Sequence, residues 1–177
     1  MTHAPARPIL LRLREWLPAI LWAALISFAS TDIFSEAHTS QIILPILQSL
    51  LPHASAATLE QVHVFIRKSA HFTEYFIFSV LLLRGIRVGR RGWQLRWALA
   101  ALALAAGYSA LDEFHQSFVP SRTASVWDSL LDTVGAATAQ AAMWFRARFD
   151  ASRTESAAER LAPATARRSH GQSDFRD

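Results

Sequence analysis

Four long apolar stretches, separated by polar segments, dominate the pattern along the chain. They cover residues 16–34, 69–83, 95–111 and 126–145. The third stretch includes the run WALAALALAAGYSAL, residues 97–111, which carries no charged side chain. A helix of a soluble protein needs a polar face, whereas a helix that crosses a bilayer needs about 17–25 mostly apolar residues. The pattern therefore predicts an all-α fold, a membrane-embedded bundle of about four transmembrane helices.

The segment between the first two apolar stretches, residues 36–68, contains a shorter apolar run. This run, TSQIILPILQSLLP at residues 39–52, is interrupted by Pro45 and is too short to cross a bilayer. We expect an extra interfacial helix here, which lies along the outer membrane surface or dips into it. Thr58 and Gln61 match a capping box, so the next helix is predicted to begin there and to continue into the second apolar stretch.

Basic residues are distributed unevenly between the two ends of the predicted bundle. Fifteen of the 18 lysine and arginine residues lie before the first stretch, from the end of the second to Arg96 at the start of the third, or after the fourth. The other three are Arg67, Lys68 and Arg122. Because basic residues concentrate on the cytoplasmic side of membrane proteins, we expect a multi-pass plasma-membrane protein with both termini in the cytoplasm.

Composition supports this class and sets the domain boundaries. The chain of 177 residues is 51% hydrophobic and only 18% charged, and its mean hydropathy is positive, at +0.17. It has no cysteine, which excludes disulfides and thiolate metal sites. No nucleic-acid-binding motif accompanies the basic pI, so we expect no nucleic-acid partner. We predict a cytoplasmic segment at 1–15, one transmembrane domain at 16–146, and a disordered basic cytoplasmic tail at 147–177.

Residues capable of chemistry gather at the end of the predicted bundle that has few basic residues. Helical spacing places them on shared faces of three segments: His71, Glu74 and Tyr75; Asp112, His115 and Gln116; Asp128 and Asp132. Asp132 lies roughly 10 Å along its helix from Ser125, at a rise of about 1.5 Å per residue. A lone carboxylate at that depth would cost several kcal/mol in lipid, so we expect Asp132 to face the interior and to meet a cation or a histidine.

These faces define two groups of candidate site residues. The acids and histidines are candidates for acid–base chemistry: His71, Glu74, Asp112, Glu113, His115 and Asp132. The helix dipole disfavours acids near the C-terminus of a helix, so we do not expect Asp112 and Glu113 to stabilise their helix. The cations and the remaining polar side chains are candidates for ligand binding: Arg67, Lys68, Tyr75, Gln116, Arg122 and Asp128.

Structural roles are open for several polar residues. Ser125 and Asp128 fit a capping box that would start the fourth helix. Lys68 and Arg122 could serve only as headgroup anchors. His71 and Glu74 could form a structural hydrogen bond between helices. Ser27 and Ser30 are expected to allow close helix packing. Three histidines of the outer loop are expected at the surface: His38, His53 and His63.

The polar residues follow a pattern that resembles the VanZ-like family of small bacterial integral membrane proteins. Two motifs carry the resemblance: R-K-x-x-H-F with a following E-Y at residues 67–75, and D-E-x-H-Q, P-x-R, S-x-x-D, D and G at residues 112–135. Ser121 stands where glycine is commonest in the family. The resemblance covers residues 16–146 and implies about four spans in a bacterial inner membrane. The family is named after a component of glycopeptide-resistance clusters linked to low-level teicoplanin resistance.

Three functions are compatible with this pattern. A binding module would hold a cell-envelope lipid, a polyprenyl-linked precursor or a glycopeptide at the outer face. An enzyme would use a histidine and a carboxylate on a lipid-linked phosphate or ester. A proton-coupled carrier would titrate Asp132 and Glu74. The histidines and carboxylates could also ligate zinc, manganese or calcium, but no metal-binding motif or cofactor motif is present, so we expect neither. The sequence leaves the ligand and the oligomeric state open.

Overall fold

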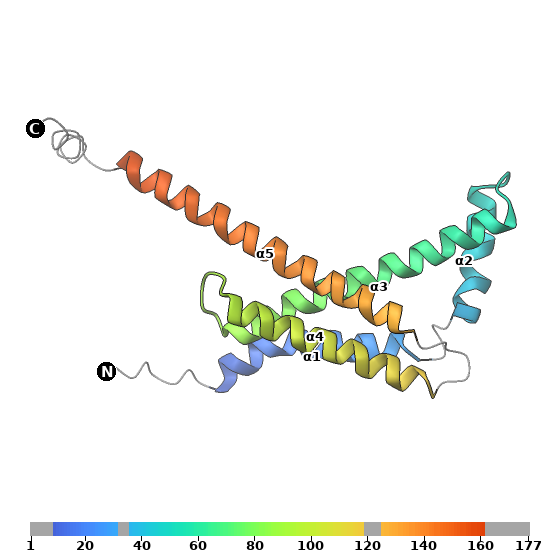
Figure 1. The fold of residues 1–177 in the computed structure, drawn as a ribbon, viewed down its shortest axis with the longest axis horizontal. Coiled ribbons are helices and arrows are strands. Elements are labelled where there is room, and N and C mark those ends of the chain that lie inside the picture. The colour runs from blue at the N-terminus through green and yellow to red at the C-terminus, as the bar shows by residue number, and fades with distance from the viewer. Residues whose placement is uncertain (1–8, 32–35, 119–124, 162–177) are drawn as a thin grey trace, which may run out of the picture.

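Five α-helices make up the computed structural model, which describes residues 9–31, 36–118 and 125–161 and has no strand among them (Figure 1). The helices are α1 (Ile9–Ala29), α2 (Glu36–Leu50), α3 (Ala56–Arg87), α4 (Leu95–Gln116) and α5 (Val126–Leu161). The prediction of an all-α fold is confirmed, including a separate helix, α2, in the segment that we expected at the interface. Whether α2 lies on a membrane surface stays a prediction.

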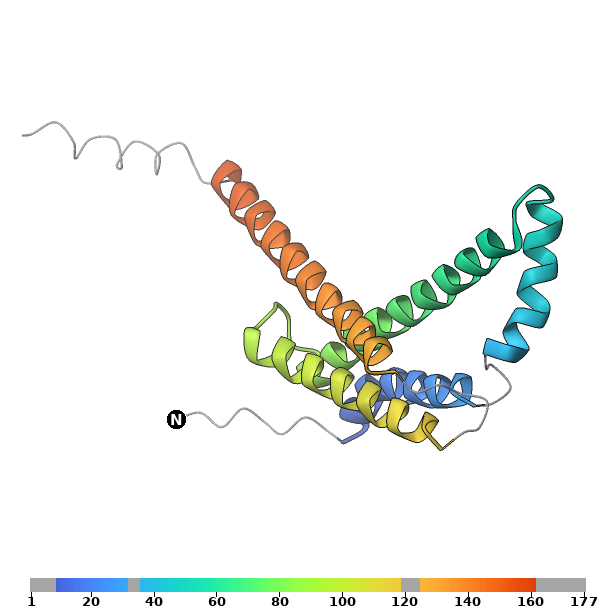
Figure 2. The same cartoon turned by 45° about the vertical axis from the view of Figure 1, so that its right-hand side comes forward.

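The long helix α3 holds the bundle together. It packs against each of the other four helices. The helix α5 crosses α3, and the C-terminal part of α5 extends beyond the other helices (Figures 1 and 2). The helix α2 contacts the N-terminal part of α3, at the far end from the connection between α3 and α4 (Figure 1). This arrangement makes α3 the reference against which the site is positioned.

The ends of α3 have clear local causes. Ser55 is the N-cap, with an extended backbone, and its hydroxyl accepts the N–H of Thr58 at 3.2 Å. The helix therefore begins at Ala56, and the predicted start at Thr58 was wrong, because Ser55 provides the capping oxygen one turn earlier. At the other end Val88 adopts a left-handed conformation, with φ at 48°, and its N–H binds the carbonyl oxygen of Gly85. The chain then turns into α4.

The crossing of α3 and α5 is close because α5 has a glycine there. A Cβ atom placed on Gly135 would clash with the carbonyl oxygen of Phe72 and would lie 3.2 Å from its Cα atom. Two turns further along α3, the Ser79 hydroxyl donates to the carbonyl oxygen of Ala136 at 3.1 Å. The Gln140 amide donates to the same Ser79 hydroxyl at 2.7 Å. The two backbones therefore touch at Gly135, and side-chain hydrogen bonds join the helices further along.

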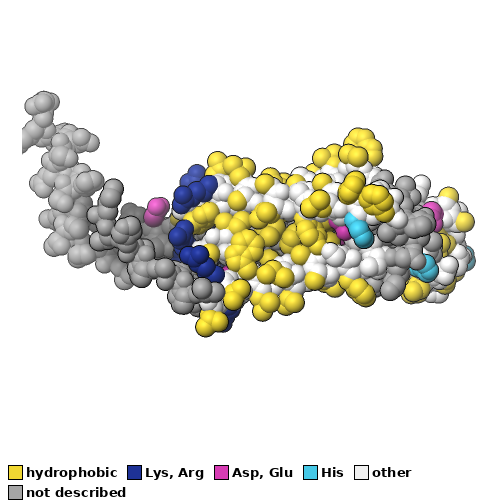
Figure 3. Space-filling view, turned by 90° about the horizontal axis from the view of Figure 1, so that it is seen from below, with side chains coloured by type: hydrophobic (Ala, Val, Ile, Leu, Met, Phe, Trp, Pro, Cys, Tyr) yellow, Lys and Arg dark blue, Asp and Glu magenta, His cyan; other side chains and the backbone are white. Residues whose placement is uncertain are grey.

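The bundle exposes apolar side chains and buries polar ones. Large hydrophobic residues face outward on all five helices, among them Leu21, Ile42, Phe65, Leu99 and Leu130. The buried polar residues include Ser30, Ser79, Ser109, Asp132 and Gln140. Figure 3 shows a broad hydrophobic face with lysine and arginine gathered at one end.

None of the helices in the described part of the chain combines the length and the apolar character that crossing a membrane requires. The four predicted crossings are therefore not confirmed, and the membrane location stays a prediction.

The predicted disordered tail is partly helical. α5 continues to Leu161, well past the expected boundary at residue 147. The cause is composition: alanine, arginine and glutamate, which are frequent there, have high helix propensity. Arg146 and Asp150 add a weak i, i+4 ion pair at 4.0 Å. Residues 162–177, and the N-terminal residues 1–8, lie outside the described ranges.

Replacing Gly135 with alanine tests the close crossing. We expect Gly135→Ala to lower the free energy of unfolding by about 1–3 kcal/mol, because α3 and α5 must move apart. The matched control is Gly107→Ala in α4, where no atom lies within 4 Å of the added Cβ. This control should be neutral or stabilising by up to about 1 kcal/mol. Thermal unfolding followed by circular dichroism measures both, and equal melting temperatures for the two variants would contradict the assignment.

Candidate functional site

The polar faces predicted on α3, α4 and α5 meet at one end of the bundle, near the start of α5. We call this group the acid–imidazole cluster, and it consists of His71, Glu74, Asp112, Glu113 and Asp132. Histidine and acidic side chains are visible near the end opposite the arginines (Figure 3). The three helices bring these side chains together because α3 lies against both α4 and α5.

Asp132 lies at the centre of the cluster. The residue is 2% exposed, and its Oδ2 atom accepts a hydrogen bond of 2.7 Å from the Ser109 hydroxyl. Its Oδ1 atom lies 3.4 Å from Nδ1 of His71, which is longer than a usual hydrogen bond. Neither of these two atoms has a hydrogen-bond partner among the described residues. Asp132 thus faces the interior and meets a histidine, as its depth in the sequence predicts.

Asp112 connects α4 to α1. Its Oδ2 atom accepts the Ser30 hydroxyl at 2.6 Å and the Gln116 amide at 2.8 Å. Ser27 lies 2.6 Å from the hydroxyl of Tyr108, which donates to the carbonyl oxygen of Ala23 at 2.7 Å. The expectation that the two serines serve only close packing was therefore wrong, since each binds a polar side chain of α4.

Glu113 caps the start of a neighbouring helix. Its Oε2 atom accepts the backbone N–H of Ser125, just before α5, at 2.8 Å. Burial raises the pKa of the Glu113 carboxyl, and the hydrogen bond from the Ser125 N–H opposes that rise. In a capping box this N–H would bind a side chain of its own helix, the role that we considered for Asp128. Asp128 instead forms an ion pair of 2.9 Å with Lys68.

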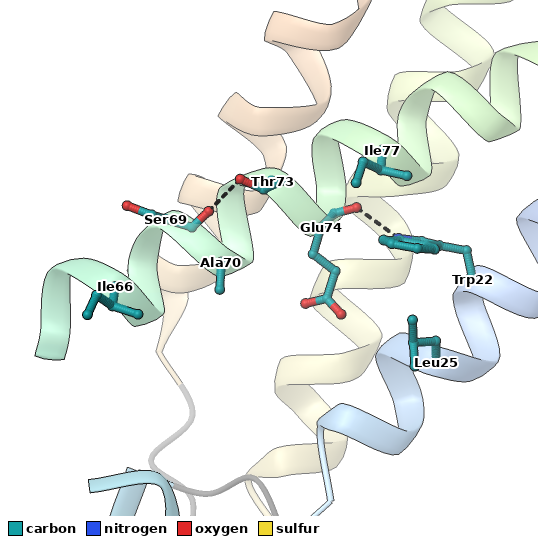
Figure 4. Close-up of a pocket in the computed structure, with 8 residues that line it drawn as sticks. All are labelled: Trp22, Leu25, Ile66, Ser69, Ala70, Thr73, Glu74 and Ile77. Atoms are coloured by element: carbon teal, nitrogen blue, oxygen red, sulfur yellow. Dashed lines mark hydrogen bonds between the residues drawn. The ribbon is translucent and has the colours of Figure 1, made fainter. Parts of the chain in front are cut away.

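Glu74 projects into a groove between α1 and α3 (Figure 4). The groove has a volume of about 510 Å³ and a mostly apolar lining: Trp22, Leu25, Ile66, Ala70 and Ile77, with Ser69 and Thr73. The indole N–H of Trp22 donates to the backbone carbonyl oxygen of Glu74 at 3.0 Å. The Glu74 carboxylate makes no hydrogen bond with the described residues, and it lies within electrostatic range of His71, Asp132 and Asp112.

Several predicted site residues lie outside the cluster. His115 is exposed, because the other residues of its turn, Glu113 and Gln116, take the buried face of α4. Tyr75 is not one of these outliers: it is buried beside the cluster, within electrostatic range of Asp132, Asp112 and Glu74, and its hydroxyl makes no hydrogen bond with the described residues. Arg67 is half-buried on α3. Arg122 falls outside the described residues.

His63 is buried, although we expected it at the surface. Its side chain is 0% exposed, and neither ring nitrogen has a hydrogen-bond partner among the described residues. The nearest charged group is Glu60, at 3.8 Å. The reason is tertiary: α2 packs on this part of α3 and covers the face that His63 shares with the buried Leu59. The other two loop histidines, His38 and His53, are exposed as expected.

Two hydroxyl groups beside the cluster were not predicted, although the sequence contains the signal. Ser109 precedes Asp112 and Glu113 by three and four residues, so it extends the same face of α4 by one turn. Ser129 stands three residues before Asp132 on α5 and lies 3.1 Å from Ser109. Extending each polar face by one turn would have found both. In the described ranges no group of three or more His, Asp or Glu side chains is arranged to hold a metal ion.

The fold and the cluster define an all-helical protein with an apolar exterior and a buried acidic site at one end. Comparison with known proteins gives this class a family. The sequence model of the VanZ/LLP1 family matches residues 15–147, which include every residue of the acid–imidazole cluster. The chain belongs to the VanZ/LLP1 family. No curated protein and no solved structure matches it.

Removing the Glu113 carboxylate tests its capping role. Glu113→Ala should lower the free energy of unfolding by about 1 kcal/mol, because the Ser125 N–H loses its acceptor. Glu113→Gln is the matched control, since its amide oxygen can still accept that hydrogen bond. Chemical denaturation of both variants measures the effect. Equal losses in alanine and glutamine would show that the charge of Glu113, not the hydrogen bond, matters.

Proposed function

We propose that this VanZ/LLP1 protein is embedded in a bacterial inner membrane and binds a cell-envelope lipid or its precursor at the Glu74 groove. The membrane location is supported by the exposed apolar side chains on every helix, since contiguous apolar surface marks contact with protein or lipid. The arginine-rich end also supports it, because basic residues concentrate on the cytoplasmic side of membrane proteins. This distribution favours an orientation with both termini in the cytoplasm and the acid–imidazole cluster outside.

The Glu74 carboxylate, which makes no hydrogen bond with the described residues, carries the binding proposal. A carboxylate among apolar side chains is costly unless a partner with hydrogen-bond donors or positive charge meets it. Trp22, Leu25 and Ile66 suit an acyl or prenyl chain, and Glu74 suits the donors of a polar headgroup. The groove thus fits a molecule that has both.

The charged side chains near Glu74 indicate which kind of lipid headgroup would bind there. Among the described residues, the charged or titratable groups that act on Glu74 are Asp112, Asp132 and His71, of which His71 can become cationic. Lys68, which we considered as a phosphate ligand, is paired with Asp128. Hydroxyl, amide or amine donors, as in an amino sugar, are therefore favoured over phosphate at this position. A lipid-linked sugar precursor and a glycopeptide with an attached acyl chain both have this chemistry.

Lipid retention tests the binding proposal. The purified protein in nanodiscs is offered a labelled polyprenyl-linked amino sugar and, separately, polyprenyl phosphate without sugar. We expect the sugar-bearing lipid to be retained and Glu74→Gln to weaken its binding at least tenfold, about 1.4 kcal/mol. The control Glu155→Gln, an exposed position on α5, should bind normally. Equal retention of both lipids, or unchanged binding by Glu74→Gln, would exclude this site.

The Asp132–His71 pair also supports a catalytic role, in which His71 acts as a general base and Asp132 stabilises its cationic form. Product analysis in the same retention assay separates the two functions, because binding alone yields no converted lipid.

In cells, we expect Asp132→Asn to abolish any change in teicoplanin susceptibility that the wild-type protein causes. Glu155→Gln should leave that change intact at equal expression. An unaltered phenotype in Asp132→Asn would assign Asp132 a structural role only.

A further inference from the structure

A second cavity lies at the other end of the bundle, where the chain passes from α3 to α4 beside α5. It has a volume of about 700 Å³. Its lining includes three arginines and one acid: Arg87, Arg91, Arg146 and Asp150. Asp150 is only loosely paired with Arg146, at 4.0 Å, and both side chains are mostly exposed. The cavity therefore has an excess of positive charge, opposite in sign to the acid–imidazole cluster.

Two nitrogen donors at this cavity lack acceptors. The Nε atom of Arg87 and the indole Nε1 of Trp93 are shielded from solvent and have no hydrogen-bond partner among the described residues. Arg87 is held in place by a bond of 3.2 Å from Nη1 to the carbonyl oxygen of Gly92. Unpaired buried donors are costly, so small rotations of Arg87 and Trp93 toward an acceptor in the cavity would be favourable. A ligand that presents only acceptors, such as a phosphate group, meets this requirement.

An apolar groove continues from the same tryptophan. It lies between α4 and α5, has a volume of about 300 Å³, and is lined mainly by apolar side chains that include Trp93, Leu99, Leu102 and Trp144. Trp93 therefore borders the basic cavity on one side and the apolar groove on the other. Tryptophan commonly occupies such boundaries between headgroups and acyl chains. The basic cavity and the apolar groove together are complementary to a lipid with an anionic headgroup.

We propose that the basic cavity binds the phosphate of an anionic membrane lipid, with Arg87, Arg91, Arg146 and Trp93 around the headgroup and an acyl chain in the α4–α5 groove. This site is separate from the Glu74 groove in position and in charge. Arginine suits it because a guanidinium can bind two phosphate oxygens at once. Basic pockets between helices are a known way to recognise lipid phosphates at the cytoplasmic side.

Charge-matched double variants test the proposal. Arg91→Gln with Arg146→Gln removes two exposed cations of the cavity, whereas Arg90→Gln with Arg153→Gln removes two exposed cations outside its lining. The full-length protein in detergent is titrated with phosphatidylglycerol, and bound lipid is counted by native mass spectrometry. We expect at least a tenfold loss of affinity in the first pair and less than a twofold change in the second. Equal losses would reduce the effect to net charge and overturn the site.

Further probes identify the ligand class. Phosphatidylcholine of the same chain length should bind at least tenfold more weakly than phosphatidylglycerol. Inorganic phosphate should fail to displace the lipid at millimolar concentration, and displacement would contradict the role of the apolar groove. Trp93→Phe, which keeps an aromatic ring but removes the N–H, should weaken phosphatidylglycerol several-fold. Glu74→Gln should bind phosphatidylglycerol normally, so this result stands or falls apart from the proposed function. Circular dichroism confirms that each variant is folded.

Discussion

The close approach of α5 to α3 at Gly135 is the constraint on which the rest of the structure depends. The absence of a side chain lets the backbones touch at Phe72, and this contact fixes both the separation and the register of the two helices. With that register set, His71 meets Asp132 on one side of the crossing, and Ser79 meets Gln140 on the other. A wider crossing would leave a buried carboxylate without its imidazole, at a substantial cost in free energy.

Polar contacts extend from this crossing to the other helices. Ser109 brings α4 to Asp132, and Asp112 brings α1 to α4 through Ser30. Glu113 of α4 then accepts the Ser125 N–H at the start of α5, which connects α4 back to one of the two crossing helices. Leaving a buried polar group without a partner is costly, so these bonds favour one arrangement of neighbouring helices. Apolar packing alone is less selective, particularly in a bundle that exposes much of its apolar surface.

The same organisation gives the two ends of the molecule different chemistry. The end that holds the acid–imidazole cluster presents a groove with the Glu74 carboxylate, and the other end presents a cavity beside Arg87 Nε and the Trp93 indole N–H. None of these groups has a hydrogen-bond partner among the described residues. The exterior between them is largely hydrophobic (Figure 3). In a membrane, such a molecule would meet donor-bearing headgroups on one side and anionic headgroups on the other. The concentration of arginine at one end would also set its orientation.

The sequence by itself determined the helices and the faces that polar residues share, because the helical period is a local property. It was enough to place Asp132 in the interior and to name all five residues of the acid–imidazole cluster, but not the neighbouring hydroxyls of Ser109 and Ser129. The tertiary structure decided which faces meet. It turned His115 outward, gave the Ser125 N–H to Glu113, and buried His63 under α2. These outcomes depend on contacts between helices far apart in the chain, and the spacing of residues within one helix contains no information about them.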